Sequence, residues 1–166
     1  MAGISFPTDL ENYMSARLSF TVNGNLIPGQ RVEVMRVQNT PRVLYIEDHE
    51  DTRELVTLVL EQRSFEVVTG STIETGLALA GSQHFDLYLL DSWLPDGSGL
   101  DLCRQIREFD KSTPILFYSA AAYEIDKDLA IRSGAQAYLI KPSQPSELCN
   151  LVTSLIQSHR RYSIAV

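Results

Sequence analysis

Three acidic residues stand directly after runs of apolar residues, where a carboxylate is costly to bury without a partner. Glu47 and Asp48 follow "RVLYI", and Asp91 follows "FDLYLL". Two later apolar runs end in Ser119, a hydroxyl, and in Lys141, an ammonium. Each residue alone fits a turn former, a helix cap or a surface residue. Carboxylates that lie close together raise one another's pKa unless a cation is present. If the fold gathers these run ends, they have the groups for a cation-dependent site.

From residue 42 the chain alternates short β-rich runs with segments of helical periodicity. Ser71, followed three residues later by Glu74, predicts a capping box at the start of the second helix. We expect Leu55, Leu58 and Phe109 to be among the helix residues that face the core. The expected strands are 42–47, 65–69, 85–91, 114–120 and 136–140, and the expected helices are 51–63, 71–83, 100–109, 123–134 and 146–160.

This alternation predicts an α/β fold with a doubly wound, five-stranded parallel sheet. Strands that are apolar along their whole length are typical of parallel sheets with helices on both faces. Five βα units fit the flavodoxin-like order 2-1-3-4-5, which reverses between strands one and three. Ligands bind such sheets at the carboxyl ends of the strands, at this reversal. Glu47, Asp48 and Asp91 follow strands one and three, so we expect their carboxylates to converge there.

Residues 1–40 differ in pattern, and we expect an N-terminal extension here, with the α/β domain at 41–166. "ARLSFTV" (16–22) alternates in polarity, "NGN" (23–25) is a turn signal, and "RVEVMRV" (31–37) fits a return strand. The extension is therefore expected to be a β-hairpin. A lone two-stranded hairpin is marginal in water. It would pack on the domain or on a second copy, as a homodimer; a flexible tether is the alternative.

The composition excludes several classes of partner. The net charge is −7, and residues 1–40 hold three acids and three arginines, so the acidic excess lies in 41–166. An acidic domain is a poor binder of nucleic acid, so we expect no direct nucleic-acid contact. No apolar run reaches the roughly 20 residues of a membrane span, and the start lacks a secretory-signal pattern. Cys103 and Cys149 fall at apolar positions of expected helices, which favours reduced thiols and a cytoplasmic protein.

Four segments together resemble the response-regulator receiver domain of two-component signalling, in its single-domain form. They are "ED" (47–48), "DSWLPDGSG" (91–99), "YSA" (118–120) and "AYLIKP" (137–142), and the resemblance covers residues 42–160. As a set these motifs are highly specific. The resemblance implies that a histidine kinase or a histidine phosphotransfer protein donates a phosphoryl group to Asp91. The phosphorylated form would then signal to a downstream protein that the sequence does not identify.

The resemblance also implies a magnesium site. Glu47 and Asp48 would hold Mg²⁺ together with Asp91 and the backbone carbonyl of Trp93. Mg²⁺ prefers oxygen ligands, keeps several waters and accepts phosphate oxygens. Glu47 stands where Asp is commoner in the family and is longer by one methylene, so it would reach the metal through water.

The remaining implied roles concern the phosphoryl group and the response to it. Asp91 would attack phosphorus to give an acyl phosphate, and Ser119 and Lys141 would bind the phosphoryl oxygens. Ser119 and Tyr138 would form the switch, because a shift of Ser119 frees space for the aromatic ring. We expect no enzymatic activity beyond self-catalysed phosphotransfer and autodephosphorylation at Asp91. The Lys141–Pro142 peptide bond is expected to be cis.

Three other interpretations stay open at this point. An aspartyl-phosphate hydrolase on a similar sheet usually has a second acid two residues after the nucleophile, where this chain has Trp93. A receiver fold that only binds partners would not need the complete set of site residues. The receiver portion of a hybrid histidine kinase is the third. The start at Met1 and the hairpin-like segment argue against that portion, and the few residues after Arg160 favour a stand-alone protein.

Overall fold

The computed structural model describes residues 40–163. The hairpin expected within residues 1–40 lies outside the described residues and stays a prediction. Within the described range the chain alternates strands and helices, as the sequence indicates. No described helix is both long and apolar enough to span a membrane.

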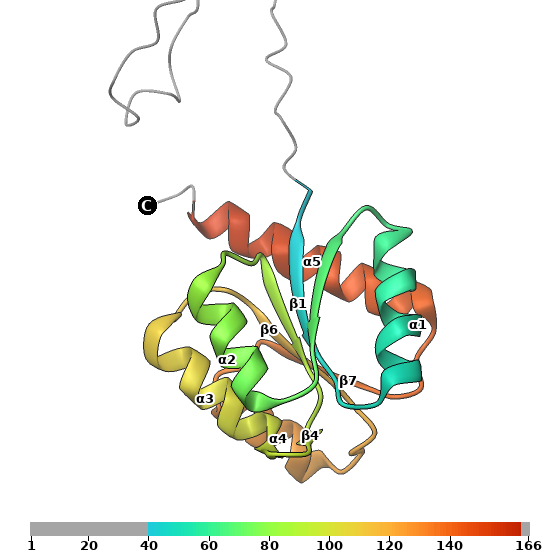
Figure 1. Ribbon diagram of the computed structural model, residues 1–166. Coiled ribbons are helices and arrows are strands. Elements are labelled where there is room, and N and C mark those ends of the chain that lie inside the picture. The colour runs from blue at the N-terminus through green and yellow to red at the C-terminus, as the bar shows by residue number, and fades with distance from the viewer. Residues whose placement is uncertain (1–39, 164–166) are drawn as a thin grey trace, which may run out of the picture. The chain divides into compact units, whose positions relative to one another are not determined.

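The central element is a five-stranded parallel sheet (Figure 1). Its order is β2-β1-β3-β6-β7, which is the expected order 2-1-3-4-5 with the last two strands labelled β6 and β7. The paired residues Ile46 and Leu90 place the ends of β1 and β3 side by side. The strands are β1 (Arg42–Ile46), β2 (Glu66–Gly70), β3 (Leu87–Leu90), β6 (Ile115–Ser119) and β7 (Ala137–Ile140).

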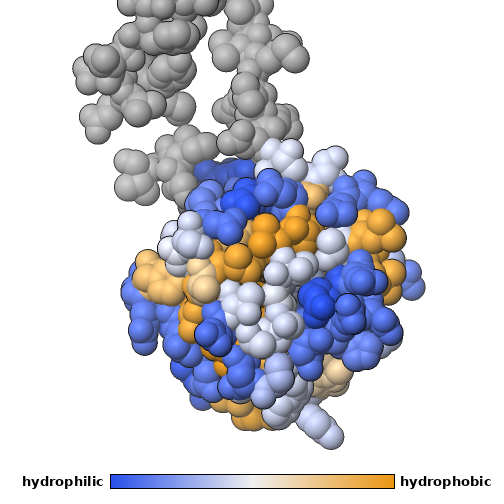
Figure 2. All heavy atoms as spheres, in the orientation of Figure 1, coloured by the Kyte–Doolittle hydropathy of each residue, from blue (hydrophilic) through white to orange (hydrophobic). Residues whose placement is uncertain are grey.

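Five helices cover the two faces of the sheet, as expected of a doubly wound fold. One hydrophobic cluster joins the sheet to α1 and α5, and a second joins it to α2, α3 and α4. On the face shown in Figure 2, most of the surface is hydrophilic and hydrophobic side chains gather in a few patches. The helices are α1 (Glu50–Glu61), α2 (Ile73–Ser82), α3 (Gly99–Phe109), α4 (Glu124–Arg132) and α5 (Pro145–Ser163).

The central strands are apolar along their length because both faces are buried. In β1, Val43 and Tyr45 belong to the cluster under α1 and α5, whereas Leu44 and Ile46 belong to the opposite cluster. All four side chains are 0% exposed. Successive side chains of a strand point to opposite faces of the sheet. A residue that directly follows a strand continues this alternation, so the face to which its side chain points can be predicted.

Three local expectations were wrong. The side chain of Thr72, not of Ser71, caps α2 by accepting from the Thr75 N–H, and Asp96 accepts from two further N–H groups of the first turn. Leu55 and Leu58 are exposed because α1 buries only a narrow stripe of residues against the sheet. Phe109 is exposed because it is the last residue of α3.

The loop after β3 is more regular than the sequence predicts. It contains two two-residue strands, β4 (Trp93–Leu94) and β5 (Gly97–Ser98), which pair antiparallel. Gly97 has φ +151°, a conformation that other residues rarely adopt. This short hairpin places the Asp96 carboxylate at the start of α2, and its last residue, Ser98, is the N-cap of α3.

The carboxylate of Asp110 makes the stability of the fold depend on pH in the acidic range. It accepts hydrogen bonds from the Tyr88 hydroxyl at 2.9 Å and from the Ser112 and Thr113 N–H groups at 3.0 Å. Partial burial alone would raise the pKa of Asp110, but the hydrogen bonds, first those of Thr113, outweigh it and lower the pKa to about 2. An unfolded Asp titrates near pH 3.9.

We therefore expect Asp110 to contribute stability that is fully present above about pH 4 and is lost as the pH falls towards about 2. Urea unfolding of the wild type and of Asp110→Asn between pH 7 and pH 2 measures this contribution. The difference in unfolding free energy should be constant at neutral pH and shrink below pH 4. Parallel curves over the whole range would contradict the assignment.

Candidate functional site

The acidic side chains converge at the carboxyl edge of the sheet between β1 and β3, as the sequence predicts. Carboxylate oxygens of Glu47, Asp48 and Asp91 all lie within 4.8 Å of one another. The backbone explains this proximity, because the Asp91 N–H donates to the Ile46 carbonyl at 2.9 Å. The parallel pairing of β1 and β3 thus continues one residue past β3 and fixes Asp91 opposite the acid pair.

Asp91 is nearly buried, with 7% of its surface exposed. One oxygen, Oδ1, lies 3.2 Å from the Lys141 ammonium, and Oδ2 accepts from the Trp93 N–H at 3.2 Å. Each oxygen therefore has a donor from a different part of the fold. The assignment of the Trp93 carbonyl to a metal stays a prediction.

Glu47 is more buried still, at 2% exposure, and it has three donors. Its Oε2 accepts from the Tyr45 hydroxyl at 2.8 Å and forms an ion pair with Lys141. Among residues 40–163, its Oε1 accepts only from the backbone N–H of His49, at 3.3 Å. Burial raises the pKa of Tyr45, and the charge of Glu47 raises it further, so the phenol stays protonated and donates.

Asp48 is the exposed member of the cluster and opens the site to solvent. The backbone that carries the acid pair is held from α1, because Arg53 donates to the carbonyl of Glu47 at 2.8 Å and to that of Asp48 at 3.2 Å. A guanidinium presents several donors in a fixed geometry, which suits it to this double contact. Arg53 therefore fixes the turn from β1 into α1.

Lys141 reaches the acids from the end of β7. Its N–H donates to the Ser119 carbonyl at 2.9 Å, which continues the pairing of β6 and β7. The Lys141–Pro142 bond is cis, as expected. The ammonium also lies 5.3 Å from the ring centre of Tyr118. A cation over an aromatic face is attracted by it, so Tyr118 helps to hold Lys141 between the two buried carboxylates.

Ser119 and Tyr138 meet at one residue of the loop after β6. Ser119, 0% exposed, accepts from the Ala121 N–H at 3.4 Å. The Tyr138 hydroxyl donates to the Ala121 carbonyl at 2.7 Å, and its ring stacks on Phe117 with 6.0 Å between centroids. Both predicted switch residues are thus tied to the backbone of Ala121, so a displacement of this loop affects both.

Strand alternation sorts the site residues by face. Glu47, Asp91 and Lys141 lie two residues after Tyr45, Leu89 and Leu139, which belong to the cluster under α1 and α5, so they point to that face of the sheet. Ser119, two residues after Phe117, and Tyr138 point to the opposite face. The charged groups and the switch residues therefore lie towards different faces of one sheet edge.

The donor set fits a hard divalent cation. Three carboxylates stand against one ammonium, so the cluster keeps a negative excess. Carboxylate and carbonyl oxygens are the ligands that Mg²⁺ takes in proteins. One acid is exposed and two are buried, which leaves a solvent side for water and a phosphate-bearing ligand.

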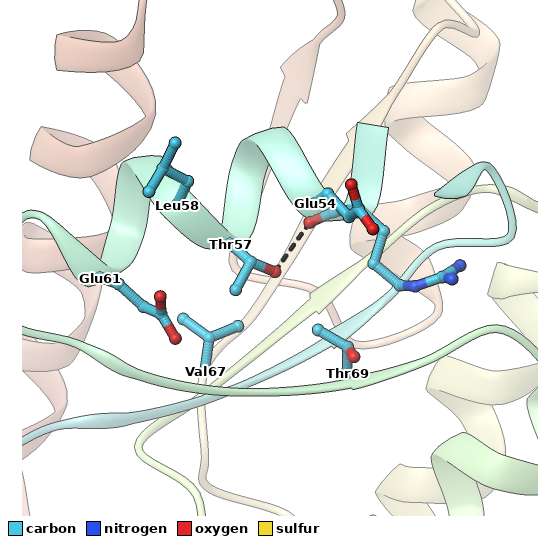
Figure 3. Close-up of a pocket in the computed structure, with 7 residues that line it drawn as sticks. Glu54, Thr57, Leu58, Glu61, Val67 and Thr69 are labelled. Atoms are coloured by element: carbon cyan, nitrogen blue, oxygen red, sulfur yellow. Dashed lines mark hydrogen bonds between the residues drawn. The ribbon is translucent and has the colours of Figure 1, made fainter. Parts of the chain in front are cut away.

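A separate groove along α1 and β2 does not include this cluster. It has a volume of about 410 Å³ and is lined by α1 residues, among them Glu54, Leu58 and Glu61, and by Val67 and Thr69 of β2 (Figure 3). Thr57 there donates to the Arg53 carbonyl, a bond within the helix. The groove holds no convergent set of ionisable groups like that at the sheet edge, so we place the functional site at the edge.

Two contacts at the site were not predicted, although the sequence carried a signal for one of them. Tyr45 precedes Glu47 by two residues in a strand, which puts both on one face. Arg53 gave no such signal, because a charged residue in the second turn of a helix is usually solvated. Its contact with the acid-pair backbone depends on how α1 packs.

A comparison with known proteins shows which family the sequence matches. The family model of the response regulator receiver domain matches residues 43–153. The transcriptional regulatory protein CreB of Escherichia coli (strain K12) is 34% identical over 124 residues, which cover 73% of this chain and 53% of CreB. The alkaline phosphatase synthesis transcriptional regulatory protein PhoP of Bacillus subtilis (strain 168) is also 34% identical, over 75% of this chain and 50% of PhoP. The chain thus spans about half the length of these curated relatives.

Solved structures show the same fold. The non-phosphorylated HemR receiver domain of Leptospira biflexa has a TM-score of 0.66 at 34% identity and covers 70% of this chain and 94% of its own. A CheY-like receiver domain protein of Methanospirillum hungatei JF-1 has a TM-score of 0.71 at 24% identity, over 74% and 98% of the two chains. The receiver domain of the sensor histidine kinase PA1611 of Pseudomonas aeruginosa PAO1, crystallised with a magnesium ion coordinated in its active-site cleft, has a TM-score of 0.67 at 24% identity, over 70% and 98%.

Gly99 provides a test of how closely the loop must return to Asp91. A Cβ atom at Gly99 would lie 1.9 Å from the Asp91 carbonyl oxygen. Gly99→Ala should therefore displace the backbone of Asp91 and destabilise the protein by about 2 kcal/mol or more. The matched control is Gly81→Ala in α2, where a Cβ meets nothing within 4 Å. This change should be neutral or stabilise by up to about 1 kcal/mol. Urea unfolding measures both; equal effects would contradict the close approach.

Proposed function

The chain belongs to the response-regulator receiver family, and from that premise we propose that it is a signalling protein that accepts a phosphoryl group on Asp91. The proposal rests on one observation: a nearly buried carboxylate lies 3.2 Å from the Lys141 ammonium and within 4.8 Å of two further acids. The donor is the phosphohistidine of a histidine kinase or of a histidine phosphotransfer protein.

Glu47, Asp48 and Asp91, with the backbone carbonyl of Trp93, would hold Mg²⁺. The ion supplies positive charge that offsets the repulsion between the acids and the incoming phosphoryl group. Asp48 is the exposed acid of the three, so it would offer its carboxylate to the ion from the solvent side while Glu47 and Asp91 stay buried.

Asp91 is placed to act as the nucleophile. Its strand fixes the backbone through the Ile46 carbonyl, and the Trp93 N–H orients Oδ2. In the reaction a carboxylate oxygen forms a bond to phosphorus while the bond from phosphorus to the donor imidazole breaks. Such transfers depend mainly on positioning and charge stabilisation, and a rigid strand end provides the first.

Lys141 and Ser119 bind the phosphoryl oxygens in this proposal. Lys141 bridges Glu47 and Asp91 in the unmodified protein, and a phosphoryl group on Asp91 gives it a new, more highly charged partner. Ser119 gives up the Ala121 N–H to turn its hydroxyl towards the phosphoryl group. These movements are short, because both residues already stand at adjacent strand ends.

The switch follows from the shared contact with Ala121. When Ser119 releases the Ala121 N–H, the loop is held mainly by the Tyr138 hydroxyl on its carbonyl. A shift of the loop breaks that bond and lets the ring move into the space that Ser119 leaves. Local electrostatics thereby bias a two-state element, and a coupling of about 1–3 kcal/mol suffices to change partner binding.

The site bears differently on two alternatives. An aspartyl-phosphate hydrolase needs a second acid where this chain has Trp93, whose side chain is 70% exposed. A receiver within a longer protein, such as a hybrid histidine kinase or a regulator with an output domain, has the same site. In either setting we propose that this domain passes its signal by protein contact rather than by binding nucleic acid.

We expect acetyl phosphate to label the protein when MgCl₂ is present and not when EDTA replaces it. Asp91→Asn should abolish the label, because an amide oxygen is a poor nucleophile. Asp110→Asn, a change at another hydrogen-bonded aspartate of the same domain, should keep it. Intact-mass spectrometry measures the phosphoryl adduct. An adduct that persists in Asp91→Asn would refute the assignment of the acceptor.

A further inference from the structure

We propose that Tyr45 is a positioning residue for the cation site: its buried hydroxyl holds Glu47 Oε2 and so presents Oε1 to the divalent cation. It keeps this hold when Lys141 leaves Glu47 for the phosphoryl group. The inference rests on the proposed function. It adds to that function a buried strand residue that contacts Glu47 and is not itself one of the proposed metal ligands.

The contact is built into β1. Tyr45 and Glu47 are two residues apart, so their side chains leave the strand on the same face. The hydroxyl oxygen lies 2.8 Å from Glu47 Oε2, the Tyr45 side chain is 0% exposed, and Glu47 is 2% exposed. Water has little access to either group, so the contact has no solvent substitute.

The two oxygens of Glu47 have different partners. Tyr45 and Lys141 both donate to Oε2, whereas the described part of the chain gives Oε1 only the His49 N–H at 3.3 Å. Two donors on one oxygen fix the plane of the carboxylate and leave the other oxygen with spare capacity. The torsion that sets this plane in a glutamate is soft, so a donor that fixes it decides where Oε1 points.

Phosphorylation makes Tyr45 more important. In the unmodified protein Glu47 has an ammonium partner, but Lys141 is also the group that the phosphoryl oxygens attract. A buried carboxylate that loses its cation needs other donors. Tyr45 is part of the same strand and supplies one, so Glu47 stays in place while Lys141 moves.

The fold offers a matched control for this contact. Tyr88, 2% exposed, also donates its hydroxyl to a carboxylate, that of Asp110 at 2.9 Å. Tyr88 belongs to the opposite face of the sheet, in the cluster under α2, α3 and α4. Tyr45→Phe and Tyr88→Phe each remove one buried hydroxyl, so a general loss of stability affects both, whereas an effect on the site affects only the first.

The experiment measures Mg²⁺ binding to the unphosphorylated protein. The chain has one tryptophan, Trp93, which lies two residues after Asp91 and donates its backbone N–H to the Asp91 carboxylate, so its fluorescence is the chosen reporter of the site. MgCl₂ titration of the metal-free protein, checked by calorimetry, gives the dissociation constant. We expect Tyr45→Phe to weaken Mg²⁺ binding about tenfold, as for residues that orient metal ligands. Tyr88→Phe should bind as the wild type does.

Coupling to Glu47 is tested in a Glu47→Ala background. There Tyr45→Phe should cause no further loss of Mg²⁺ affinity, because the group it positions is absent. Wild-type affinity in Tyr45→Phe, equal losses in both phenylalanine variants, or an undiminished loss in the Glu47→Ala background would each overturn the positioning role. A wild-type protein that binds no Mg²⁺ by calorimetry would instead overturn the proposed cation site, and this inference with it.

Discussion

Two carboxylates that water barely reaches, those of Glu47 and Asp91, share one ammonium group, that of Lys141. Burial of a charge is costly unless it is paired and hydrogen-bonded, and each of these acids has an N–H or hydroxyl donor in addition to the ammonium. The parallel register of β1 and β3 and the position of Lys141 after β7 are needed to bring the three groups together. The arrangement of charges at the edge of the sheet therefore depends on the order and register of its strands.

Under the proposed function, the same arrangement would let the protein respond to a phosphoryl group on Asp91. An ammonium between two carboxylates is a shared partner, and added negative charge on one of them alters the balance between the two. In the proposed switch the response would pass through Ala121, because Ser119, beside this group, and Tyr138, on the next strand, both contact it. Packed interiors move between discrete arrangements rather than deforming gradually, which makes such a short chain of contacts an effective switch.

Much of this could be predicted from sequence because it depends on alternation alone. The apolar runs predict the strands, and their alternation with helices predicts the strand order. The convergence of Glu47, Asp48 and Asp91 follows because two of these runs, neighbours in that order, end in acids. The start of α2 could not be predicted, because Asp96 caps it from a hairpin 23 residues further on. The exposure of Leu55 was also missed: how α1 rotates against the sheet is set by tertiary packing, which periodicity does not resolve.

The alternation of side chains along the strands divides the site residues between the two faces of the sheet. Tyr45, Glu47 and Lys141 belong to the face under α1 and α5, whereas Phe117 and Tyr138 belong to the face under α2, α3 and α4. Glu47 and its partners are therefore supported from one hydrophobic cluster, and the predicted switch residue Tyr138 is supported from the other. Because the sheet separates the two clusters, packing on the switch side can change without displacing the acids.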